Sequence, residues 1–187
     1  MALCAGLLIN MVSPGLADEA NLHDDPDAFG PLDIKTISHA HGKGDRLVHF
    51  IATYGRWGAK TLRSEDSDIQ LLFTTDGDNK PERVLVVDNH QGFVRAVMHK
   101  WQKGIGKKTY GNARIRRTGP RAAKLVFSPG LLGKGVGEYG WHVDTRFSDE
   151  DHRRCTLRNG TIYVCPDSAP NETAPRAYLR HSTARVG

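Results

Sequence analysis

The chain has 187 residues, of which 39% are hydrophobic and 25% are charged, and its formal net charge is +5. This length and composition are typical of one soluble globular domain with its own core, and the sequence contains no internal repeat, heptad pattern or low-complexity tract. The 20 glycines and nine prolines indicate frequent turns, which favours an all-β fold.

The first element is an apolar block over residues 2–12, followed by Pro14 and by small residues that end at Ala17. This arrangement predicts a secretory signal peptide over residues 1–17 and therefore a secreted protein. The block is too short to span a bilayer, so we expect no transmembrane segment in the mature chain. The alternative is that the block forms a buried N-terminal helix or strand.

An acidic N-terminal arm follows over residues 18–30, which contain no Lys or Arg. We expect this arm to be mobile or to be held by partners elsewhere in the protein. The remainder, residues 31–183, is predicted to be a single β-sandwich domain.

Short strand-like segments then alternate with turn signals along the chain. The expected strands cover residues 32–39, 46–54, 69–75, 82–88, 93–100, 113–118, 122–128 and 139–147. Several of them alternate apolar and polar residues, which is typical of half-buried strands. The pattern predicts an antiparallel β-sandwich, with a short helical turn near residues 129–134 that caps one end.

Cys155 and Cys165 flank the last predicted hairpin, in which Asn159 and Gly160 suit a type I′ turn. An even cysteine pair in an exported chain predicts a disulfide that closes this C-terminal hairpin. A two-residue turn would place Cys155 opposite Val164. We therefore expect a bulge or a looser loop that lets the two sulfur atoms meet.

Several segments carry a resemblance to a known group of proteins. They read DDPDAFGPLDIKTISH, TYGRW, LLFTTDGDNKPERVLVV, SPGLLGKGV and YGWHVDTRF, and the cysteine pair follows them. In this order they resemble secreted actinobacterial β-sandwich proteins of unassigned function, and more distantly carbohydrate-binding family 9 and DOMON-like sandwiches. The resemblance covers residues 24–181 by pattern and implies the sandwich fold, export and a polysaccharide ligand.

The turn after residues 69–75 is a candidate calcium site. In the similar proteins this turn reads Asp-x-Asp-Gly-Asp-Gly, and here Thr74, Asp76 and Asp78 occupy alternate ligand positions. Alternate carboxylates of a tight loop can converge on Ca²⁺, and Glu82 would supply a closing carboxylate. Thr74 offers only a hydroxyl and Lys80 would repel a cation, so the alternative is a polar hairpin tip made of ordinary turn residues.

Histidines offer a weaker metal hypothesis. A hairpin turn centred on residues 43–44 would place His39 opposite Val48, so His39, His41 and His49 would not converge. We therefore expect no transition-metal site from these three residues.

Residues 99–124 carry nine Lys or Arg and no acidic residue. Together with Trp101 and Tyr110 this basic strip is a candidate site for a polyanion, and Trp57, in a glycine-rich loop, is the candidate with the most exposed ring for stacking on a sugar. Nucleic acid is not expected, because export takes the protein away from the genome. The alternatives are a solvated strand face, neutralised by the acidic arm, and tryptophans buried in the core.

No G-x-S-x-G, H-E-x-x-H or P-loop motif is present, so no catalytic residue is assigned and no enzyme is predicted. The sequence predicts a secreted, non-catalytic binding or surface-associated module with a polysaccharide as its ligand. Two alternatives stay open: an extracellular hydrolase, and a module that binds a protein or polyanion through residues 99–124.

Overall fold

The computed structural model describes residues 21–63, 66–76, 80–102, 104–148, 155–158 and 162–169. The predicted signal peptide lies outside these residues, as does the start of the acidic arm. Within the described part, no helix is long or apolar enough to cross a membrane.

The fold is all-β, as predicted, and every strand pair is antiparallel. Strands β1 to β6 are Asn21–His23, Ile34–Gly42, Arg46–Thr53, Asp68–Thr74, Arg83–His90 and Phe93–Gln102. Strands β7 to β11 are Gly104–Gly119, Ala122–Phe127, Gly140–Ser148, Thr156–Arg158 and Ile162–Ala169. β1 was not expected as a strand. It holds part of the acidic arm by pairing with β2.

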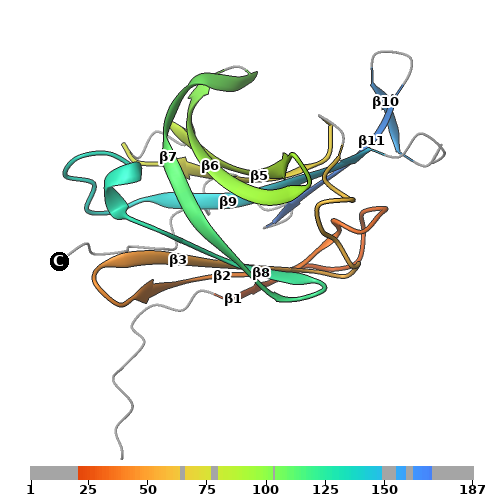
Figure 1. Cartoon of the computed structure of the whole chain (residues 1–187), viewed down its shortest axis with the longest axis horizontal. Coiled ribbons are helices and arrows are strands. Elements are labelled where there is room, and N and C mark those ends of the chain that lie inside the picture. Colours follow the sequence, from red (N-terminus) through yellow and green to blue (C-terminus); the bar gives the residue numbers. More distant parts are fainter. Residues whose placement is uncertain are drawn as a thin grey trace, which may run out of the picture.

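The strands form two layers joined by β7, which runs diagonally from one layer to the other (Figure 1). Hydrogen bonding links them in the order β1-β2-β3-β8-β7-β6-β5-β4-β9-β11-β10. Residues 104–113 of β7 pair with β6 and residues 114–119 with β8. The first layer therefore contains β1, β2, β3, β8 and the end of β7, and the second layer contains the start of β7 with β4, β5, β6, β9, β10 and β11. Because β7 takes part in both layers, the strands form one continuous hydrogen-bonded order that folds into a sandwich.

The core lies between the layers and is built from alternate residues of each strand, because side chains of a strand point to opposite faces in turn. These inward residues include Ile37, Ile51, Leu71, Phe73, Leu85, Met98, Leu125 and Phe127, all of them fully buried. The second layer also buries a small group on its outer face, where Trp101 packs on Leu72, Val84 and Val86.

The predicted helical turn is present as η1, a 3₁₀ turn over Pro129–Leu131, shorter than the expected 129–134. Ser128 caps it by accepting a hydrogen bond from the Gly130 N–H. Proline at the first position suits a helix start because its missing N–H has no partner there in any case.

The Cys155–Cys165 disulfide is also present, with Cα atoms 4.7 Å apart. Thr156 pairs with Val164 and Arg158 with Ile162, which leaves three residues for the loop. The loop is therefore one residue longer than a type I′ turn, and this extra residue brings the two cysteines opposite one another. The expected looser loop is what allows the bridge.

The predicted register of the histidine hairpin was wrong. The β2–β3 connection leaves three residues unpaired instead of two, with Gly44 and Asp45 both at positive φ. One extra loop residue shifts the pairing, so His39 lies directly opposite His49 on the core face, with ring centroids 6.0 Å apart. The histidines do converge, but in the described residues they take part in no cluster of three metal-ligating groups.

Candidate metal centre

Three aspartates from the two ends of the described chain meet beside the edge where β2 approaches β11. Asp24 and Asp27 follow β1, and Asp167 lies in β11. One carboxylate oxygen from each lies within 4.8 Å of the others. Asp24 and Asp167 are buried and Asp27 is exposed, so this acidic cluster is closed by protein on one side and open to water on the other.

Main-chain hydrogen bonds place these carboxylates. The Asp24 N–H donates to the Lys35 carbonyl at 3.1 Å, and the Tyr54 hydroxyl donates to the Asp24 carbonyl at 2.7 Å. Asp167 in turn accepts a hydrogen bond from the Ile34 N–H at 2.5 Å. The last contact joins residues 133 positions apart, so the cluster forms only when the two layers close.

A fourth carboxyl, that of Asp33, stands next to the acidic cluster. Asp33 and Asp24 are 7% and 6% exposed, and Asp33 Oδ1 and Asp24 Oδ2 are buried without a hydrogen-bond partner among the residues that the structure describes. A buried carboxylate oxygen without a donor is unfavourable by about 1–3 kcal/mol or more. A cation bound at the cluster would give these oxygens a partner, in addition to the backbone hydrogen bonds that the two carboxyl groups receive from Asp25 and Ala28.

The electrostatics of the cluster point the same way. Burial, followed by repulsion from Asp167, raises the pKa of Asp24 to about 7 and that of Asp33 to about 6. Burial also raises the pKa of Asp167. No Lys or Arg is among the groups that shift these pKa values. The acidic cluster could hold a metal ion, because a cation would supply the missing positive charge.

Gly55, just after β3, lets the segment that carries Asp24, Asp27 and Asp33 lie close to the sandwich. A Cβ at Gly55 would come within 2.9 Å of the Pro31 carbonyl oxygen. We expect Gly55→Ala to lower the free energy of unfolding by about 1–3 kcal/mol, as overpacking does, which urea denaturation measures. Gly58→Ala is the matched control, since nothing lies within 4 Å of its Cβ position. An equal loss in both variants would contradict this explanation.

The predicted calcium turn stays a prediction, because Asp78 lies outside the described residues. Thr74 is buried at the end of β4, and Asp76 is exposed. The Glu82 carboxylate accepts hydrogen bonds from the Thr75 N–H at 2.6 Å and from its hydroxyl at 3.0 Å. Glu82, just before β5, is therefore hydrogen-bonded to the residue that follows β4.

The three predicted ligand-binding aromatics have different surroundings. Trp101 packs on the outer face of the second layer, and Tyr110 lies between two cations, with Arg83 4.1 Å and Lys108 5.3 Å from its ring centroid. Trp57 was expected to be the most exposed of the tryptophans, and this was wrong because it is only 6% exposed. The Arg117 guanidinium covers its ring at 3.6 Å from the centroid.

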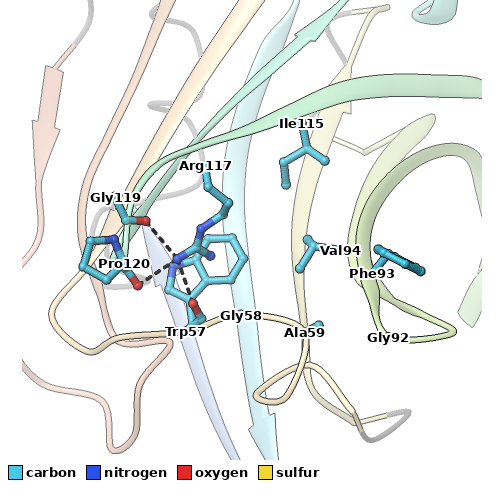
Figure 2. Close-up of a pocket in the computed structure, with 10 residues that line it drawn as sticks. All are labelled: Trp57, Gly58, Ala59, Gly92, Phe93, Val94, Ile115, Arg117, Gly119 and Pro120. Atoms are coloured by element: carbon cyan, nitrogen blue, oxygen red, sulfur yellow. Dashed lines mark hydrogen bonds between the residues drawn. The ribbon is translucent and has the colours of Figure 1, made fainter.

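Trp57 nevertheless lines a hollow of about 490 Å³. Figure 2 shows Trp57 and Arg117 on one side, Phe93 on the other, and Val94 and Ile115 between them. Phe93 and Arg117 were not singled out as ligand-binding residues. The available signal was the position of Phe93, a large apolar residue directly after the two-residue turn at Gln91 and Gly92, where a hairpin tip exposes it.

The acidic cluster offers oxygen ligands, and the hollow offers an exposed aromatic ring beside a fixed guanidinium. Each is interpreted from the chemistry of its own residues. Comparison with known proteins found no matching family model, no matching curated protein and no matching solved structure.

Proposed function

We propose that this protein is an exported, non-catalytic binding module whose two ends are held together by Ca²⁺ at Asp24, Asp27, Asp33 and Asp167. One observation carries the calcium proposal: within the described part of the chain, Asp24 Oδ2 and Asp33 Oδ1 are buried without hydrogen-bond donors, beside further carboxylates. A cation there would link the segment after β1 to β11, so binding the ion and closing the sandwich would be one event.

The ligand atoms favour Ca²⁺ over other metals. All of them are oxygens, which suits calcium or magnesium and not the metals that prefer nitrogen or sulfur. Ca²⁺ takes six to eight oxygens in a flexible arrangement. Exposed Asp27 leaves one side of the acidic cluster open, so water can complete the shell. Dissociation constants of about 10⁻⁴ to 10⁻³ M suffice outside cells, where calcium is plentiful.

Export and a binding role are supported less directly. The Cys155–Cys165 disulfide is typical of proteins from oxidising compartments outside the cytosol. A rigid two-layer sandwich with exposed loops is a common scaffold for ligand recognition, although the fold alone assigns no ligand. The polysaccharide ligand follows from the sequence resemblance.

Thermal melts with millimolar calcium and with chelator test the metal proposal. At about 5 mM calcium and a dissociation constant of about 10⁻⁴ to 10⁻³ M, we expect calcium to raise the melting temperature by an amount that corresponds to about 1–2 kcal/mol. Asp24→Asn and Asp167→Asn should each abolish most of the shift. Asparagine keeps an acceptor oxygen at residue 167, so the contact with the Ile34 N–H is retained.

Asp45→Asn, in the exposed β2–β3 turn, is the matched control and should keep the full shift. Melting curves that coincide with and without calcium would overturn the proposal. A shift that survives Asp24→Asn but disappears in Asp76→Ala would assign calcium to the turn after β4 instead.

A further inference from the structure

Phe93 is the large hydrophobic side chain that the described surface leaves exposed, at 77%. It stands at the tip of the β5–β6 hairpin, directly beside Val94 and the hollow. A single exposed apolar residue is common on protein surfaces. Phe93 differs because it lines a hollow together with the apolar residues Val94 and Ile115, which adds to the apolar surface available to a ligand (Figure 2).

The opposite side of the hollow is rigid. One nitrogen of Arg117, Nη2, donates to the carbonyls of Trp57 at 2.7 Å, Gly119 at 3.0 Å and Pro120 at 2.7 Å. The guanidinium also stacks on the Trp57 ring. A side chain held by three acceptors and a ring loses little entropy when a ligand binds beside it, so this side is preorganised.

Exposed cationic residues flank the hollow in the sequence. Arg56, Lys60 and Arg121 each directly precede or follow a lining residue in the sequence, and all three are exposed. None of them forms an ion pair within the described part of the chain. No acidic residue is next to a lining residue in the sequence. An anionic ligand would therefore be attracted to these cationic residues.

From these features we infer that the hollow binds an acidic polysaccharide, with Phe93 packed on a sugar ring and with Arg56, Lys60 and Arg121 around its anionic groups. The inference rests on the proposed role as a binding module and adds the site and the ligand class. The apolar C–H face of a pyranose suits an aromatic ring, and hydrogen bonds from cations to carboxylate or sulfate are among the strong ones.

Nucleic acid could also offer flat rings and negative charge to such a site. The disulfide favours the glycan, because disulfides persist in oxidising compartments away from the genome. Single-stranded DNA therefore serves as a competing probe in the test.

The test measures binding of an oligogalacturonate and of its fully methyl-esterified form, which keeps the sugar rings but lacks the charge. We expect the charged form to bind at least about tenfold more tightly and to weaken as salt is raised. Phe93→Ala and the pair Lys60→Ser with Arg121→Ser should each reduce affinity by about tenfold or more. Both changes affect exposed side chains, so the melting temperature should stay within a few degrees of the parent value.

Arg114→Ser with Arg116→Ser is the charge-matched control. These two arginines alternate with Ile115 on β7, so they point away from the hollow. The inference would be overturned if the control variant lost affinity while Phe93→Ala kept it. It would also be overturned if the methyl ester or single-stranded DNA bound as tightly as the charged oligogalacturonate. Binding of a neutral glycan that Phe93→Ala abolishes would overturn the acidic ligand class yet leave the binding module standing. The calcium melt is read independently of all these outcomes.

Discussion

Replacing Arg146 with methionine is expected to lower the free energy of unfolding by about 3–5 kcal/mol. Arg146 in β9 lies directly opposite Asp68 in β4. Its Nε donates to Asp68 Oδ1 at 2.9 Å, and its Nη2 donates to Asp68 Oδ2. The Asp68 side chain is only 4% exposed. Methionine would keep much of the packing but leave a buried carboxylate with Gln70 as its remaining side-chain donor.

Urea denaturation of two further variants checks whether the charge of Arg146 is responsible. Arg95 makes a similar two-point contact with Asp88, but the two side chains are 44% and 30% exposed. Arg95→Met should therefore cost less than about 1 kcal/mol. Asp68→Leu combined with Arg146→Met should recover most of the stability, because no buried charge is left unpaired. A double variant as unstable as Arg146→Met alone would show that packing, and not charge, is responsible.

The contribution of His49 to stability is expected to fall as the pH drops below about 6.5, because His49 must stay neutral in the folded protein. His49 is 0% exposed, and burial, followed by the nearby His39, lowers its pKa well below the usual range. The unfolded chain therefore binds the proton more readily than the folded one. The contribution is fully present above the unfolded pKa and is lost toward acid, by about 1.4 kcal/mol per pH unit for one histidine.

The surroundings of His49 explain why it cannot easily accept the charge. The rings packed around it are His39, Phe73, Phe127, Tyr139 and Trp141. Of these only His39 and Tyr139 titrate, and burial raises the pKa of Tyr139, which keeps its hydroxyl neutral. The Tyr139 hydroxyl lies 3.2 Å from His49 Nε2. None of these rings, which belong to the described part of the chain, carries a negative charge that would stabilise a protonated His49.

Urea denaturation across this pH range compares the parent protein with His49→Phe, which keeps the stacking on Phe127. In His49→Phe the slope of the free energy of unfolding against pH should change by about 1.4 kcal/mol per pH unit, which corresponds to one proton. In His90→Gln, at an exposed position of β5, the slope should not change. Asp24 and Asp33 act in the opposite direction, because their raised pKa values favour the folded state as the pH falls. The difference between variant and parent isolates His49. Parallel pH profiles would contradict the assignment.

Local patterns in the sequence were sufficient for most of the strands, the 3₁₀ turn and the cysteine hairpin, but not for β1 or for the part of β7 before residue 113. Alternating apolar residues determine which face of a strand is buried, and Ser128 with Pro129 begins η1 through contacts within a few residues. The cysteine spacing required a loop longer than two residues, and the observed pairing has one. In each case the decisive interaction lies between residues close together in the chain, so the sequence by itself determined the result.

The tertiary structure alone decided what the candidate sites contain. One extra residue in the β2–β3 connection placed His39 opposite His49, although the sequence predicted that they would not converge. The prediction failed because the length of a glycine-rich turn is poorly encoded in its sequence. Trp57 became buried because Arg117, 60 residues away, folds over it. Asp24 and Asp27 meet Asp167 only when the first and last described strands come together. Contacts over such distances depend on how the layers close, which no local pattern specifies.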